Sequence, residues 1–190
     1  MFMYHLGQLK MSGLIKRVPA GYTLTTAGKT FVSGMSLQAA EQRKQPKIVV
    51  MLDCKNDNGQ QLLFKWSRQP YFGLVSLPFS KLHYGMSAQE FAGTELKYRS
   101  NLSGNPVYRG DAYIQTLYKD KVVDHVLVHI FSLANMTGTL SSKEPIIGEA
   151  FWGDTKAYKN SNVVPGFFEI LKLLDTKNQK FFKELNINKY

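Results

Sequence analysis

Two short apolar segments on either side of an Asn-Gly pair constrain the fold more than any other feature of the chain. The segments KIVVMLDC (residues 47–54) and QLLFKW (residues 61–66) are rich in β-branched and large apolar side chains, and Asn58-Gly59 lies between them. An Asn-Gly pair between two such segments is typical of a β-hairpin. Residues 47–66 are therefore expected to begin the sheet of a main domain.

The rest of this domain is expected to combine strands and helices. Ser87 followed by Glu90 is the pattern of a capping box at the start of a helix. Pro165 is expected to open a C-terminal helical region that continues through residues 181–185. Further strands are expected at residues 112–118, 122–131 and 146–152. Strands with helices between and after them predict an α/β fold.

A polar stretch that ends at Pro46 divides the chain of 190 residues. Pro46 disfavours helix at the residue before it, so one unit is expected at residues 1–45 and a second at residues 46–190. The whole chain has 24 Lys or Arg and 14 Asp or Glu, a net charge of +10. Residues 1–45 contain six Lys or Arg and one Glu. This concentration of positive charge indicates nucleic acid, a phosphate-rich ligand or an anionic surface as the partner.

The composition is that of a globular protein without export or membrane signals. Hydrophobic residues make up 44% of the chain, which is enough for a core. Cys54 is the only cysteine, so it cannot form an intramolecular disulfide and is expected to pack as a small apolar side chain. Lys10 interrupts the N-terminus before a signal-peptide core could form, and no run of 18 apolar residues is present. A cytoplasmic protein with no membrane partner is therefore expected.

The N-terminal unit is expected to contain a helix, a hairpin and a second helix. Its expected elements are a helix over residues 4–12, paired strands at residues 15–17 and 22–24, and a helix over residues 27–35. Gly13 would end the first helix, and Thr25 or Thr26 would cap the second. This order, with the string YHLGQLKMSGLIKRVPAGYTLTTAGKTF, resembles the second half of a winged helix-turn-helix domain.

The resemblance implies that the first helix and the wing contact duplex DNA through His5, Gln8, Lys10, Lys16 and Arg17. The two helices that precede the recognition helix in that family are missing here, although they set its angle in the groove. Three explanations are open: the chain starts at an internal methionine of a longer protein, a partner covers the helix, or the unit is a remnant that packs on the main domain. In the alternative without DNA, the basic side chains are a solvated face.

Residues 47–190 resemble the Nudix fold. The similarity is carried by KIVVMLDC, the NG turn, QLLFKW, SRQPYFGLVSLP, SAQEFAGTEL, GEAFWGD and VVPGFFEILK. The resemblance implies an α/β/α sandwich with a mixed sheet. It also implies a Nudix box, G-x5-E-x7-R-E-U-x-E-E-x-G-U with U apolar, whose loop-helix-loop holds a divalent metal and a diphosphate.

The Nudix box is degenerate in this chain. Alignment on Pro78 places the following residues at its glycines, acids and arginine: Ser80, Met86, Thr94, Glu95, Tyr98, Arg99 and Asn101. Mg²⁺ and Mn²⁺ prefer oxygen ligands, and Glu95 is the only acid left on the matching helix face. Arg99 would repel a divalent cation and would either pair with Glu95 or contact a phosphate. No metal site is therefore predicted, and Mg²⁺ or Mn²⁺ would be needed only if hydrolase activity survives.

The candidate ligand-binding residues are Arg68, Tyr71, Phe72, Arg99 and Glu149. An arginine that hydrogen-bonds a phosphate and a ring that stacks on a base would both suit a nucleotide. In the alternative without a ligand, the aromatic side chains anchor a loop and Glu149 is a surface carboxylate.

These observations favour a binding protein, in which a Nudix-like domain without its metal ligands is joined to a partial winged-helix unit. Such a protein would bind a nucleotide-type small molecule and contact duplex DNA, as a monomer or a homodimer, in transcriptional regulation. The alternative is a divergent Nudix hydrolase that acts on a nucleoside diphosphate-linked substrate and uses Glu95, Glu149 or another acid as ligand or base.

Overall fold

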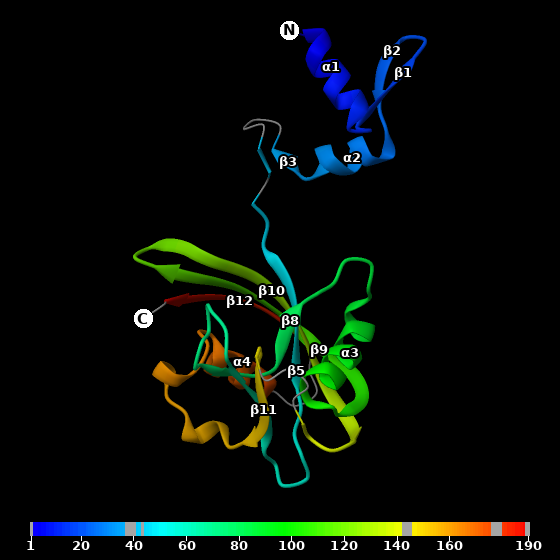
Figure 1. The fold of residues 1–190 in the computed structure, drawn as a ribbon. Coiled ribbons are helices and arrows are strands. Elements are labelled where there is room, and N and C mark those ends of the chain that lie inside the picture. The colour runs from blue at the N-terminus through cyan, green and yellow to red at the C-terminus, as the bar shows by residue number, and fades with distance from the viewer. Residues whose placement is uncertain (1, 37–40, 43, 142–145, 176–179, 189–190) are drawn as a thin grey trace. The chain divides into compact units, whose positions relative to one another are not determined.

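The computed structural model describes residues 2–36, 41–42, 44–141, 146–175 and 180–188. The chain divides into two compact units, Met1–Gln45 and Pro46–Tyr190 (Figure 1). No helix in the described residues is both long enough and apolar enough to cross a membrane.

The smaller unit contains two short helices around a β-hairpin, as the sequence predicts (Figure 1). Its elements are α1 (Phe2–Met11), β1 (Ile15–Val18), β2 (Gly21–Leu24), α2 (Thr26–Ser33), β3 (Met35–Ser36) and β4 (Glu41–Gln42). Strands β1 and β2 pair antiparallel. Gly13 follows α1 with a φ of 71°, a conformation that glycine adopts without strain. The Thr25 hydroxyl caps α2 by accepting a hydrogen bond from the Gly28 N–H.

The larger unit combines helices with two sheets. Its elements are β5 (Lys47–Asp53), β6 (Gln61–Trp66), β7 (Val75–Ser76), β8 (Phe79–Lys81), α3 (Ala88–Ser100), β9 (Ser103–Tyr118), β10 (Lys121–Thr137), β11 (Gly148–Gly153), η1 (Thr155–Ala157), η2 (Asn160–Asn162), α4 (Phe167–Leu174) and β12 (Phe181–Asn188). One sheet has five strands in the order β12-β9-β10-β5-β8, and the other has three in the order β11-β6-β7. The five-stranded sheet is mixed, because β5 and β12 run parallel to β10 and β9 while β9 and β10 pair antiparallel.

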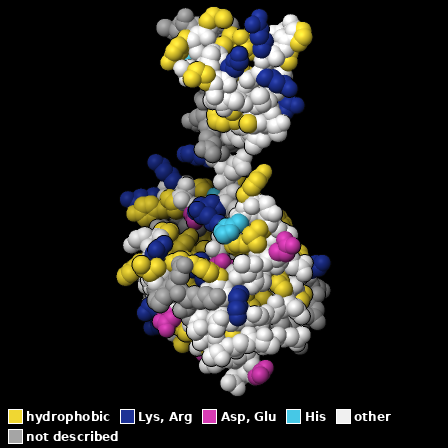
Figure 2. Space-filling model, turned by 45° about the vertical axis from the view of Figure 1, so that its right-hand side comes forward, with side chains coloured by type: hydrophobic (Ala, Val, Ile, Leu, Met, Phe, Trp, Pro, Cys, Tyr) yellow, Lys and Arg dark blue, Asp and Glu magenta, His cyan; other side chains and the backbone are white. Residues whose placement is uncertain are grey.

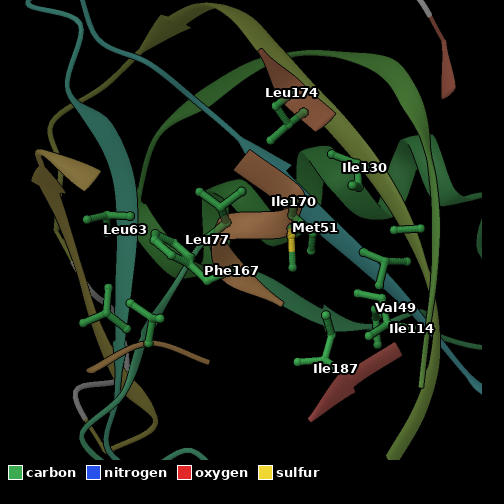
Figure 3. Close-up of a cluster of buried hydrophobic side chains, with 14 residues drawn as sticks. Val49, Met51, Leu63, Leu77, Ile114, Ile130, Phe167, Ile170, Leu174 and Ile187 are labelled. Atoms are coloured by element: carbon green, nitrogen blue, oxygen red, sulfur yellow. The ribbon is translucent and has the colours of Figure 1, made fainter. Parts of the chain in front are cut away.

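The side chains of β5 alternate between two separate cores. Val50 belongs to the core that α3 covers, whereas Val49 and Met51 belong to the core that α4 covers. This alternation follows from the geometry of a strand, whose successive side chains point to opposite faces. Figure 3 shows the second core, in which Phe167 and Ile170 of α4 lie close to Met51. The larger unit is therefore an α/β/α sandwich.

Helix α3 begins at the predicted capping box. The Ser87 hydroxyl accepts a hydrogen bond from the Glu90 N–H at 3.2 Å, and the Glu90 carboxylate accepts one from the Ser87 N–H at 3.3 Å. Asn101 follows the helix in a left-handed conformation with a φ of 59°, which asparagine tolerates better than most residues. Both ends of α3 are therefore fixed by local sequence.

Several predicted elements differ in extent or type. Strands β9 and β10 are longer than the sequence indicates, and β11 begins at Gly148 rather than at residue 146. The predicted helix over residues 181–185 is wrong, because this segment forms β12 beside β9. Phe181, Leu185 and Ile187 of β12 pack on the α4 core. They are separated by even numbers of residues, so they share one face of a strand once β9 offers a parallel partner.

Candidate functional site

The larger unit contains a cavity of about 440 Å³ between the start of β5, the β9–β10 hairpin and the segments 70–74 and 161–165. Its apolar lining is Pro70, Tyr71, Leu74, Val123, Val163, Val164 and Pro165, and its polar lining is Lys47, Thr116, Asp124 and Ser161. In Figure 2, hydrophobic side chains gather on the left of the larger unit, below several Lys or Arg side chains. An apolar cavity with a few polar groups is typical of a small-molecule site.

One corner of the cavity is charged. The Asp124 carboxylate pairs with the Lys47 ammonium at 2.5 Å and accepts hydrogen bonds from the Tyr71 hydroxyl at 3.2 Å and the His125 N–H at 2.8 Å. Partial burial acts to raise the pKa of Asp124, but the hydrogen bond and charge of Lys47 outweigh it, so the pKa lies below its usual value. Burial, and then the nearby Asp124 charge, raise the pKa of the Tyr71 hydroxyl. At neutral pH the corner therefore holds an anionic Asp124 and a neutral Tyr71.

The Asp124 carboxylate should make the free energy of unfolding of the larger unit depend on pH in the acidic range. A carboxyl group with a lower pKa in the folded than in the unfolded state stabilises the fold above its unfolded pKa of about 3.9. This contribution is lost as the pH falls through the lower folded pKa. The variant Asp124→Asn should therefore lose less stability than the parent protein between pH 5 and the most acidic pH at which the parent still folds, as measured by urea unfolding.

Asp120→Asn is the matched control, because Asp120 is exposed at the turn of the same hairpin and has a φ of 59° that asparagine tolerates. It should leave the acid dependence unchanged. Equal acid dependence in the Asp124→Asn variant and in the parent would show that the Lys47 pair contributes nothing measurable.

A group of aromatic rings connects this corner to α3. The Tyr71 ring lies 5.8 Å from the Trp66 ring and 5.7 Å from the Phe79 ring. The Arg99 guanidinium lies over the Trp66 ring at 5.4 Å and over the Phe64 ring at 4.9 Å. The cavity wall therefore rests on side chains that also contact α3.

The polar face of α3 is occupied by a buried ion pair. Arg99 Nε donates to Glu95 Oε1 at 2.6 Å, and Arg99 Nη2 donates to the Ser80 hydroxyl at 3.3 Å. The side chains of Arg99 and Glu95 are 9% and 7% exposed. Of the two roles that the sequence left open for Arg99, the ion pair with Glu95 is the one found.

The structure brings one of the five predicted ligand residues into the cavity. Tyr71 lines it, whereas Arg68 and Phe72 are exposed in the same loop and are not part of the lining. Arg99 is buried on α3, and Glu149 is exposed on β11 opposite a lysine of β6. The sequence did not identify the other lining residues, because Lys47, Thr116, Asp124 and Ser161 lie far apart in the chain and share no motif.

The residues predicted to contact DNA lie on the surface of the smaller unit. The exposed set is His5, Gln8 and Lys10 on α1 with Lys16 and Arg17 on β1. Helix α1 also exposes Met3, Tyr4 and Met11, at 71%, 67% and 82%. Part of the exposed face of α1 is therefore apolar, unlike a face made only to contact phosphates.

Comparison with known proteins identifies the fold. No protein-family model matches the chain, and no curated protein matches its sequence. Among solved structures, the mutator MutT protein from Bacillus halodurans is 18% identical with a TM-score of 0.61, covering 74% of this chain and 89% of its own. A MutT Nudix hydrolase from Burkholderia pseudomallei is 16% identical with a TM-score of 0.58, covering 69% and 99%. An ADP-ribose pyrophosphatase from Streptococcus suis is 14% identical with a TM-score of 0.53, covering 74% and 100%. The chain therefore has the Nudix fold, as predicted.

The side chains of α3 do not fit the divalent metal that the Nudix resemblance implies. Mg²⁺ and Mn²⁺ take several oxygen ligands, usually carboxylates. Glu95 is held by Arg99, and the positions aligned with the paired glutamates of the box are Tyr98 and Arg99. In the described part of the chain, no three His, Cys, Asp or Glu side chains are grouped so that they could hold a metal ion. The described side chains of α3 therefore do not form a site that fits this metal.

Proposed function

We propose that the larger unit binds a phosphate-bearing small molecule of the nucleotide type in the 440 Å³ cavity, without metal-dependent hydrolysis. The observation that carries the proposal is the buried ion pair of Glu95 and Arg99. A carboxylate held by a guanidinium is not free to coordinate a metal, and the adjacent positive charge repels one. The cavity is separate from this pair but is connected to it through Trp66 and Tyr71.

The second candidate function is a divergent Nudix hydrolase. The solved structures with this fold support it more directly than they support binding alone, since their names describe a Nudix hydrolase and an ADP-ribose pyrophosphatase. In this candidate, Glu95 or Glu149 would act as metal ligand or base. The side chains of α3 support the first candidate, because Glu95 would have to leave Arg99 before it could act.

ADP-ribose is a suitable probe to separate the two candidates. Calorimetric titration should show that it binds, and product analysis with Mg²⁺ or Mn²⁺ should show no release of AMP. Turnover that is abolished by Glu95→Gln, but not by the exposed control Glu184→Gln, would establish the hydrolase instead. If neither ADP-ribose nor any other nucleotide binds, the binding proposal is wrong.

We also propose that the smaller unit contacts duplex DNA through Lys16, Arg17 and the exposed polar side chains of α1. The support is its charge, because residues 1–45 have six Lys or Arg and one Glu. Retention on duplex DNA should weaken as salt rises, with a shallower slope for Lys16→Ala/Arg17→Ala than for the parent. The control Lys29→Ala removes an exposed charge on α2 outside the proposed contact. Retention that is negligible and independent of salt would contradict DNA binding.

A further inference from the structure

The walls of the cavity suit a hydrocarbon chain better than a nucleobase. Six of the described lining side chains are aliphatic, and Tyr71 is the only aromatic one among the described lining residues. The Tyr71 ring already contacts Trp66 and Phe79, so it is fixed in the wall rather than free to stack. Recognition of a base needs a free aromatic face and polar groups placed along the base edge. The described lining offers mainly an aliphatic surface.

Most polar side chains of the lining already form hydrogen bonds or ion pairs within the protein. Both oxygens of Asp124 accept hydrogen bonds, from Lys47 and the adjacent main chain on one oxygen and from Tyr71 on the other. The Ser161 hydroxyl donates to the next residue along the chain. Among the described lining residues, the Thr116 hydroxyl is the uncharged polar group that remains. One hydroxyl group cannot by itself form the set of hydrogen bonds that would recognise the edge of a nucleobase.

The Lys47 ammonium lies at the rim and, although it pairs with the Asp124 carboxylate, it is the cation of the described lining that a phosphate outside the apolar space could contact. The Lys47 side chain is 47% exposed while it pairs with Asp124. A lysine ammonium has three N–H donors, so donors remain after the contact with Asp124. A phosphate at the rim could therefore bind Lys47 while the rest of the ligand fills the cavity.

We propose that the ligand of this cavity is a phosphate or diphosphate ester of an aliphatic hydrocarbon, with the hydrocarbon inside and the phosphate at Lys47. This inference rests on the proposed function, because it keeps a phosphate-bearing ligand in the same cavity. The two proposals differ in the part of the ligand that fills the cavity, which is a hydrocarbon here and a nucleoside in the proposed function. A hydrocarbon chain gains affinity with every methylene removed from water, whereas a nucleotide does not offer this dependence.

Hexyl, octyl and decyl phosphate, used below their critical micelle concentrations, are the probes that test this proposal. Calorimetric titration should give a dissociation constant that falls about fourfold for each added methylene. AMP should bind at least about tenfold more weakly than decyl phosphate. A dissociation constant that does not change with chain length would overturn the inference.

Val123 and Val122 provide a matched pair of variants. Both are 51% exposed on β10, but only Val123 lines the cavity. Val123→Asp should weaken binding of decyl phosphate by more than about tenfold, because it places a charge in the apolar wall. Val122→Asp should leave binding unchanged. Equal effects of the two variants would show that the alkyl chain lies elsewhere on the surface.

The outcomes separate this inference from the proposed function. If ADP-ribose binds and the alkyl phosphates do not, the hydrocarbon inference is wrong and nucleotide binding stands. If the alkyl phosphates bind with the expected dependence and nucleotides do not, the inference stands and the nucleotide type of the proposed ligand is wrong. If neither class binds, both are wrong.

Discussion

The variant Arg99→Met is expected to lower the free energy of unfolding of the larger unit by about 3–5 kcal/mol. Methionine keeps much of the apolar volume of arginine but leaves the Glu95 carboxylate without its partner, in a position where its side chain is 7% exposed. An unpaired charge at such a site costs far more than the net gain from the pair itself. Urea unfolding followed by the fluorescence of Trp66 and Trp152 would measure the loss.

Two further variants separate this cost from a general effect of removing a positive charge. Lys97→Met removes an exposed charge from the same helix and should change the free energy of unfolding by no more than about 0.5 kcal/mol. The double variant Glu95→Leu/Arg99→Met removes both charges and should recover most of the stability. If Arg99→Met is as stable as Lys97→Met, the buried pair is not the main constraint on α3.

The ion pair of Glu95 and Arg99 also limits the reactions in which Glu95 could take part. A reaction that needs a free Glu95 would have to separate it from Arg99 and leave a buried charge without its partner, which is costly. The pair also supports Trp66, which packs on Tyr71 of the cavity wall. The ion pair therefore keeps Glu95 engaged within the protein and links α3 to the wall of the cavity.

The elements that could be predicted from the sequence are those fixed by local patterns. The start of α3 follows from the capping box of Ser87 and Glu90, and the Asn-Gly turn lies between β5 and β6 as predicted. The predicted pairing of these two strands as a hairpin is wrong, because β5 joins the five-stranded sheet and β6 the three-stranded sheet, with an isolated bridge between Lys55 and Gln61. Strand β12 could not be predicted in this way, because Phe181 and Leu185 are four residues apart and also suit a helix. Their strand conformation depends on pairing with β9, about 70 residues earlier in the chain.

The site was less predictable than the fold, because its residues also come from parts of the chain that lie far apart in the sequence. The Nudix resemblance directed attention to Arg99, where the i, i+4 spacing from Glu95 correctly suggested an ion pair. The charged corner of the cavity joins Lys47, Tyr71 and Asp124, which come from three segments of the chain. Only the folded sheet brings these side chains together, so no spacing in the sequence could have indicated the corner.

The variant Gly28→Ala is expected to unfold the smaller unit while the larger unit stays folded. A Cβ atom at Gly28 would lie 1.9 Å from the backbone oxygen of Leu14 and 3.1 Å from the Leu24 side chain. The backbone cannot yield as the end of a side chain could, so the cost should exceed the usual 1–3 kcal/mol of overpacking, about the whole stability of a unit this small. Amide hydrogen exchange should show loss of protection across residues 2–36 and unchanged protection in residues 46–141.

Gly34→Ala is the matched control at the other end of α2. Its φ is −87°, which alanine adopts readily, and the nearest atom to a new Cβ is the Phe31 oxygen at 3.6 Å, an ordinary contact. Protection should therefore be kept in this variant, and so should any retention on duplex DNA. If Gly28→Ala also retains its protection, the close crossing of α2 over Leu14 does not hold the smaller unit together. If Gly28→Ala loses protection but still binds DNA with the parental salt slope, the contact lies outside the smaller unit.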